Sequence, residues 1–190
     1  MKTIIINNPK EYSIFLKKVK YYKYYKFTKF NIKNNINNKD LDIIIKSLNI
    51  KKRKERITYL YDSIVNYLNE YYKDNICDFK NNQCFVQRET KTNNLYGCCL
   101  NCKYVKSNLG CISSNVSCKL TYCRSAKKKL KLIKLRDIPF TNCLTPLQKF
   151  IIKNDYFSTR EQVINDLYYG IPYYLIRSFI KGIKITFKIK

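Results

Sequence analysis

The stretch that decides how this chain is organised runs from Cys77 to Cys123 and reads CDFKNNQCFVQRETKTNNLYGCCLNCKYVKSNLGCISSNVSCKLTYC. It holds eight of the nine cysteines, and only Cys143 lies outside it. Between the cysteines stand Asn, Lys, Ser, Gly and single apolar residues, so this stretch cannot build a hydrophobic core of its own. We therefore expect thiolate chemistry to hold it together, through a bound metal, an iron–sulfur cluster or disulfides.

The remainder of the sequence favours a metal. The first residues contain an apolar run of only three isoleucines, too short for a secretory signal, which predicts a cytoplasmic protein in a reducing compartment where structural disulfides are rare. The chain has no histidine, so mixed cysteine–histidine zinc sites are excluded. Four thiolates suit zinc and also suit an iron–sulfur cluster. We expect zinc, with an iron–sulfur cluster, disulfides and unmetallated thiols as the alternatives.

Eight cysteines divide naturally into two four-thiolate sites. The C-x2-C pair Cys99 and Cys102 is a common metal half-site, because two thiolates at that spacing can reach one ion. Adjacent thiols rarely reach the same ion, so one grouping puts Cys77, Cys84, Cys99 and Cys102 at one site and Cys98, Cys111, Cys118 and Cys123 at the other. We expect Cys143 to be a small buried apolar residue.

Part of the stretch resembles a known family. Its elements Gly97-Cys98-Cys99, Gly110-Cys111 and Cys118-Lys119-Leu120-Thr121-Tyr122-Cys123 look like those of bacterial cysteine-cluster proteins described as zinc- or iron-chelating. The resemblance covers residues 97–123. It departs from the family pattern in the closing element, where Lys119 replaces an arginine, the spacing differs by one and the preceding Arg-Pro is missing. The resemblance implies metal binding and no particular reaction.

The charge of the chain predicts a polyanionic partner. There are 38 Lys and Arg against 13 Asp and Glu, a formal net charge of +25. Nucleic acid is the expected partner and an anionic membrane surface is the alternative, because both attract a chain of this charge. The codons of an AT-rich genome account for the many Lys, Asn, Ile and Tyr residues but not for the sign of the charge. No small-molecule substrate is inferred.

The candidate nucleic-acid contacts fall in three basic runs. Cations alternate with aromatic residues at 20–27, and this mixture is typical of proteins that bind single strands by stacking and charge. Two further runs lie at 51–56 and 124–136. The alternatives are a solvated surface and, after the last clustered cysteine, cations that offset the charge of a four-thiolate zinc site. The predicted contacts are Lys20, Lys23, Tyr24, Lys51, Lys52, Arg53, Lys54, Arg124, Lys127, Lys128, Lys129 and Lys131.

Hydrophobic patterning predicts an α+β, mainly α-helical fold with a central Cys-rich metal-binding module and a short terminal β pairing. We expect a basic helical region at 1–76, the module at 77–123 and a basic helical region with a C-terminal strand at 124–190, within one compact domain. The expected helices are 9–27, 40–48, 53–73, 146–154 and 159–169. Residues 31–38 should form an Asn-rich loop. The alternating residues 183–190 should form a strand that pairs with 2–6, or else a basic tail on anionic lipid.

No catalytic site is predicted. With four glycines and no histidine, the chain lacks the common nucleotide-binding loops and Ser-His-Asp sets. The first hypothesis is therefore a zinc-binding protein that binds nucleic acid without catalysis. The second is an iron–sulfur or metal-handling redox protein. The third is a protein that binds a membrane surface or a protein partner and uses its cysteines only for structure.

Overall fold

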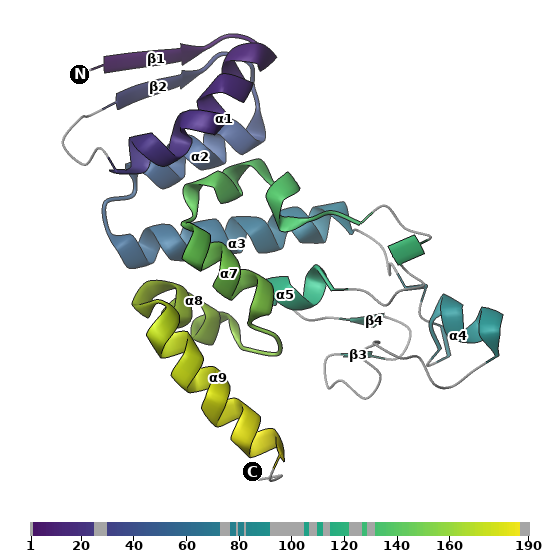
Figure 1. Ribbon diagram of the computed structural model, residues 1–190. Helices are drawn as coiled ribbons and strands as arrows, with labels where there is room; N and C mark the ends of the chain where they lie inside the picture. Colours follow the sequence, from purple (N-terminus) through teal and green to yellow (C-terminus); the bar gives the residue numbers. More distant parts are fainter. Residues whose placement is uncertain are drawn as a thin grey trace.

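The computed structural model describes residues 2–24, 30–72, 77–78, 80–81, 83–91, 105–106, 110–111, 115–121, 127–128 and 132–186. These residues form eight α-helices, two short 3-10 helices and two sheets of two strands each. Figure 1 shows most of the helices packed into one body, with α4 lying apart from it. The expected mainly helical α+β class is confirmed.

A parallel strand pair opens the chain. β1 (Lys2–Ile6) pairs with β2 (Phe30–Asn34) over its whole length. The strand expected at 2–6 is therefore confirmed. The loop expected at 31–38 is wrong for 31–34, which belong to β2, and is confirmed for 35–38. Among the described residues β1 pairs with β2 and not, as expected, with the C-terminal residues. Asparagine disfavours strands, but Ile32 stands opposite Ile4 and both pack against the core. This burial outweighs the local preference of the asparagines.

α1 (Pro9–Tyr24) connects the two parallel strands. Its start is stabilised much as expected, because the Glu11 N–H donates to Asn8 Oδ1 at 2.9 Å. The Glu11 carboxylate in turn accepts from the Asn7 N–H at 2.7 Å, one residue earlier than a standard capping box. Phe15 and Val19 are buried on the inner face. Residues 25–27, where we expected the helix to end, lie outside the described part of the chain.

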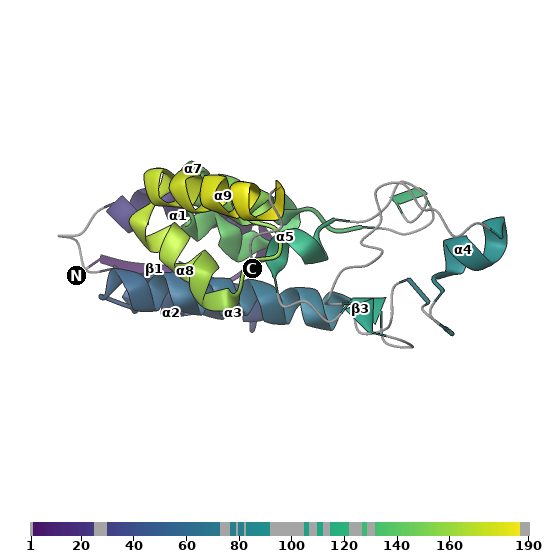
Figure 2. The ribbon, with the colours of Figure 1, turned by 90° about the horizontal axis from the view of Figure 1, so that it is seen from below.

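Two helices expected from the sequence form the next layer. α2 (Lys39–Asn49) and α3 (Arg53–Tyr71) are both confirmed, and their apolar stripes lie in the main core. The buried residues of α3 are Ile57, Leu60, Tyr61, Ile64 and Leu68. Figure 2 shows α2 and α3 along one side of the body, with α7 and α9 along the opposite side.

The expected capping signals start α7 (Pro146–Asn154) and α8 (Arg160–Tyr169). Thr145 and Gln148 form the capping box of α7, and Thr159 and Gln162 form that of α8. Thr159 and not Ser158 is the N-cap of α8, so this helix begins one residue later than the start predicted at 159. The reason is that the Ser158 side chain is used elsewhere: its hydroxyl donates to Asp155.

The C-terminal residues form a helix. α9 (Ile171–Thr186) includes the first four residues of the strand expected at 183–190, so that prediction is wrong for 183–186, and 187–190 lie outside the described residues. The alternation of apolar and basic residues was misleading because Arg177 and Lys181, four residues apart, share one face of a helix and meet polar partners there. The residues that contact the body therefore repeat every 3–4 positions, as in a helix, and not every second position, as in a strand.

The described parts of the Cys-rich stretch are short. They include α4 (Phe85–Thr90), the antiparallel pair β3 (Val105–Lys106) and β4 (Gly110–Cys111), and α5 (Val116–Lys119). The 3-10 helices η1 (Leu135–Asp137) and η2 (Pro139–Cys143) follow. α5 is joined to the helical body, because Val116 lies in the main core and the Ser117 hydroxyl donates to the Ile152 carbonyl of α7.

None of the described helices combines the length and the apolar character that crossing a lipid bilayer requires.

Candidate functional site

The start of α3 carries four consecutive basic residues, Lys51–Lys54, and all four are exposed. Among the described residues, only Lys52 of the four has an ion pair, with its Nζ 3.0 Å from Glu55 Oε1. A helix N-terminus carries partial positive charge, which disfavours cations there. The structure also gives α3 no side-chain cap at Lys52. Local helix stability therefore does not explain why these four residues are basic.

A row of three tyrosine rings begins beside this basic run, because α8 packs against α3. The guanidinium of Arg53 lies 5.3 Å from the centre of the Tyr168 ring, and Lys54 Nζ lies 5.9 Å from it. The Tyr168 and Tyr169 rings meet edge to face at 5.0 Å, and Tyr169 in turn contacts Tyr173 at 4.9 Å. We call Lys51–Lys54, Tyr168, Tyr169 and Tyr173 the basic–aromatic surface. Tyr169 is its most open ring, with 58% of the residue exposed.

A second contact aligns the start of α8 with the middle of α3. Arg160, the first residue of α8, donates two hydrogen bonds of 2.6 Å to the Asp62 carboxylate in the middle of α3. Together with the approach of Arg53 to Tyr168, this pair makes the two helices antiparallel. The antiparallel arrangement explains why the end of α8 reaches the start of α3.

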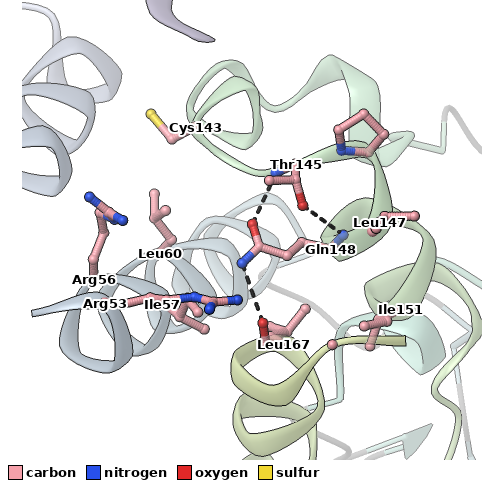
Figure 3. Close-up of a pocket in the computed structure, with 12 residues that line it drawn as sticks. Arg53, Arg56, Ile57, Leu60, Cys143, Thr145, Leu147, Gln148, Ile151 and Leu167 are labelled. Carbon is pink, nitrogen blue, oxygen red and sulfur yellow. Dashed lines mark hydrogen bonds between the residues drawn. The ribbon is translucent and has the colours of Figure 1, made fainter. Parts of the chain in front are cut away.

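A cavity of about 450 Å³ opens next to the basic–aromatic surface, between the start of α3, the start of α7 and the end of α8. Figure 3 shows Arg53 extending from α3 toward Leu167, and Arg56 lying along the α3 wall on the side of Cys143. The apolar residues that line the cavity are Ile57, Leu60, Pro146, Leu147, Ile151 and Leu167. Arg56 has no carboxylate partner among the described residues, although it is half-buried.

Gln148 fixes the floor of this cavity. Its Oε1 accepts from the Thr145 N–H at 2.9 Å, and its Nε2 donates to the Leu167 carbonyl at 3.4 Å (Figure 3). One side chain thus links the start of α7 to the end of α8. The Gln148 amide is held by these two hydrogen bonds, and Arg53 and Arg56 are the cationic groups in the cavity lining that could meet an anion.

Cys143 borders the same cavity but is used for structure. Its Sγ lies 3.4 Å from Ser47 Oγ, and that hydroxyl is 2.8 Å from the Ile44 carbonyl. A hydroxyl has one proton. Since the carbonyl can only accept, the proton of Ser47 goes to Ile44, and the thiol is the donor to Ser47. This agrees with the expected role of Cys143 as a small buried residue.

The other predicted nucleic-acid contacts are only partly described. Lys127 and Lys128 are exposed, whereas Arg124, Lys129 and Lys131 lie outside the described residues. α1 includes Lys20, Lys23 and Tyr24 in its last two turns, but their side chains are not in the described part. Of the three predicted basic runs, Lys51–Lys54 is therefore the one that lies beside aromatic residues in the described part of the chain.

Among the described residues no three cysteines or carboxylates are close enough to share a metal ion. Cys77 packs against the small cluster formed by Cys84 and Val86. Cys77 and Cys84 flank a tight turn that is closed by the backbone pairing of Lys80 with Gln83. Cys111 lies in β4 and Cys118 is buried in α5 on the helical body. The predicted ligands Cys98, Cys99, Cys102 and Cys123 lie outside the described residues. The eight-cysteine ligand set stays a prediction.

Arg56, Tyr168, Tyr169 and Tyr173 were not predicted as contacts. The sequence does contain a signal, because two Tyr-Tyr pairs flank Gly170-Ile171-Pro172. The signal was not decisive because tyrosines at a helix end are also common core residues, and only the antiparallel packing of α3 and α8 puts them beside a basic run.

Comparison with known proteins found no matching family model, no matching curated protein and no matching solved structure. The resemblance over residues 97–123 therefore stays a prediction from its motifs.

Proposed function

We propose that this protein binds nucleic acid on the basic–aromatic surface without catalysing a reaction, and that it prefers single strands to duplexes. The observation that carries the proposal is the packing of α8 on α3, which puts Tyr168 next to the exposed cations Arg53 and Lys54. Tyr169 and Tyr173 continue the row of rings from Tyr168. Cations meet backbone phosphates, and exposed rings stack on unpaired bases.

The cavity supports the preference for single strands. Its volume of about 450 Å³ lies within the range of known ligand pockets. Its walls are apolar, and Arg53 and Arg56 stand on one side of it. An unpaired base can enter such a cavity while its phosphate meets a guanidinium, which binds phosphate oxygens at two points. In a duplex the faces of the bases are stacked and cannot do this.

The proposal includes zinc as the group that holds residues 77–123 together, at four-thiolate sites. In its favour, Cys77 and Cys84 lie near one another across a tight turn, and thiolates are the donors that structural zinc prefers. Zinc supplies folding free energy to segments that have no core of their own. In this scheme the metal has a structural role, and the nucleic acid contacts the helical body.

Fluorescence anisotropy with labelled 20-nucleotide single strands and duplexes, over a series of salt concentrations, tests the nucleic-acid proposal. The variant Lys51→Gln/Lys52→Gln/Lys54→Gln removes three charges from the surface. We expect weaker binding of all sequences and a slope of log K against log salt that is smaller by about 2, since each phosphate contact on a single strand contributes about 0.7.

The matched control is Lys10→Gln/Lys17→Gln/Lys18→Gln, which removes the same charge from three exposed positions of α1. It should retain most of the affinity. If both triple variants lose affinity equally, binding reflects net charge alone and the basic–aromatic surface is not the site. Tighter binding of duplexes than of single strands also contradicts the proposal.

A further inference from the structure

The outer face of α9 is apolar, although a surface helix normally turns polar residues toward solvent. Its inner face packs Ile171 and Tyr174 against the core and also carries two cations. The inner face carries Arg177, whose guanidinium donates to the Asp166 carboxylate, to Asp155 Oδ1 at 2.7 Å and to Ser158 Oγ at 3.0 Å. Lys181, one turn later, donates to the Tyr156 carbonyl and to Ser158 Oγ at 3.4 Å. These polar contacts fix the orientation of the helix on the body.

The face that points away from the body carries six large side chains: Tyr173, Leu175, Ile176, Phe179, Ile180 and Ile183. Ile176 is 63% exposed and Phe179 is 71% exposed. Residues spaced three or four apart lie on one side of a helix, so these side chains form a continuous apolar strip. Soluble monomers rarely expose such strips, and those that do use them to bind a partner.

α7 widens the strip. Its exposed residue Phe150 contacts the Tyr174 ring of α9 at 6.3 Å, edge to face, and Leu147 lies one turn earlier on α7 and is also exposed. Figure 2 shows α7 and α9 together on one outer side of the molecule, opposite α2 and α3. We call the exposed apolar residues of α7 and α9 the α7–α9 face.

The charges near this face distinguish between possible occupants. α7 and α9 contain no Asp or Glu. Of their cations, Lys153 of α7 is exposed and Lys149 is partly exposed, whereas Arg177 and Lys181 face the body. A second copy of the chain would bring +25 against +25, which opposes association through this face. Nucleic acid has no aliphatic surface to cover such a strip. An anionic lipid surface offers both negative head groups and hydrocarbon.

We propose that the α7–α9 face docks on an anionic membrane surface, with α9 lying parallel to the bilayer and its apolar side chains at the boundary between head groups and acyl chains. A helix of 16 residues is about 24 Å long, which suits a helix lying in the interface and not one that crosses the bilayer. The face shares Tyr173 with the basic–aromatic surface and Leu147 with the neighbouring cavity, and its other named residues belong to neither, so this inference goes beyond the proposed function.

The chain contains no tryptophan, so Phe179→Trp introduces a single fluorescent reporter at the most exposed position of the face. The probes are vesicles of phosphatidylcholine alone and vesicles of phosphatidylcholine with a quarter phosphatidylglycerol. We expect the emission of Phe179→Trp to shift to the blue with the anionic vesicles only. The control Tyr71→Trp, at an exposed position near the end of α3, should not shift.

Co-sedimentation with the same vesicles measures the affinity. The variant Ile176→Gln/Phe179→Gln changes two side chains that lie mostly in solvent, so it should fold with an unchanged melting temperature. We expect it to lose at least about tenfold in vesicle affinity, since burying either side chain contributes more than a tenfold factor. Its affinity for single-stranded nucleic acid should stay the same, which separates this inference from the proposed function.

Three results would overturn the inference. The first is undiminished vesicle binding by Ile176→Gln/Phe179→Gln, and the second is equal binding of the wild type to both kinds of vesicle. The third is a concentration-dependent dimer in sedimentation velocity that this variant abolishes, because a second copy would then occupy the face.

Discussion

Arg177 in α9 forms a two-point ion pair with Asp166 in α8, with its Nε 2.9 Å from both carboxylate oxygens. Asp166 is fully buried and the Arg177 side chain is 18% exposed. The same guanidinium also reaches the buried Asp155. One cation therefore neutralises two buried carboxylates and attaches α9 to the end of α7 and to α8. The direction in which the apolar residues of α9 point depends on this cluster.

Replacing Arg177 by Gln should destabilise the protein strongly. The change leaves two buried carboxylates without their main cation, and breaking a buried ion pair in this way costs about 3–5 kcal/mol. The control Arg160→Gln removes an equally well-formed pair with Asp62, but that pair is half exposed and should contribute about 1 kcal/mol or less. Urea denaturation followed by circular dichroism measures both free energies of unfolding. Equal losses of unfolding free energy in the two variants would mean that burial does not make the Arg177 cluster more stabilising than the half-exposed Arg160–Asp62 pair.

The buried cluster should also make stability depend on pH. Burial raises the pKa of Asp166 to about 6, and the neighbouring Asp155 adds to this increase, while hydrogen bonds from Arg177 oppose it. In the unfolded chain the carboxyl ionises near its ordinary value of 3.8. Between these two values the native state holds the proton and the unfolded state does not, so the stabilisation present at low pH is lost as the pH rises through this window.

The variant Asp166→Asn isolates that effect. We expect the free energy of unfolding of the wild type, minus that of the variant, to fall as the pH rises from about 4 to about 6 and to level off above that. Urea denaturation at half-unit pH intervals measures the difference. A difference that grows with pH over the same window would show that pairing with Arg177, and not burial, dominates the ionisation of Asp166.

We expect Lys52 to contribute to nucleic-acid binding while lowering the stability of the folded protein. It occupies the N-cap of α3 without capping it, and serine is a much better N-cap residue. We expect Lys52→Ser to raise the free energy of unfolding by about 0.5–1 kcal/mol and to weaken nucleic-acid binding. Denaturation and anisotropy on the same preparation check the two effects. A variant that gains stability with unchanged affinity would remove Lys52 from the interface.

Tyr169 should act as a stacking platform. Its side chain is largely exposed, so truncating it removes few internal contacts. We expect Tyr169→Ala to weaken binding of single strands by about 1–3 kcal/mol and to leave the salt dependence unchanged, because no charge is lost. Tyr71→Ala, at another exposed tyrosine, is the control and should bind like the wild type. Equal affinities of the two variants would argue against stacking at Tyr169.

Metal content should depend on Cys77 and Cys84 but not on Cys143. Elemental analysis of protein purified without oxygen should find about two zinc ions per chain, since eight thiolates divide into two tetrahedral sites. Cys77→Ser/Cys84→Ser should lose one of them, whereas Cys143→Ala should keep both. Iron with inorganic sulfide in place of zinc would favour the redox alternative. Cysteines found cross-linked as disulfides would contradict the metal scheme.

The helices were predictable where local signals agree with burial. Asn8 and Thr145 stand at helix starts that their own sequence neighbourhoods indicate, and α3 has an apolar stripe that needs no tertiary information to recognise. The basic run Lys51–Lys54 was also evident from the sequence. These features depend on residues within a few positions of one another, so the sequence alone determines them.

The tertiary structure decided the rest, for a common physical reason: each feature depends on a partner far away in the chain. Ile32 is in a strand because β1 lies beside it, and 183–186 are helical because Arg177 and Lys181 have buried polar partners on α8 and on the segment before it. Tyr168 meets Arg53 only because α8 runs antiparallel to α3. The sequence by itself determined which residues are cationic, aromatic or apolar, and packing decided which of them face one another and which face outward.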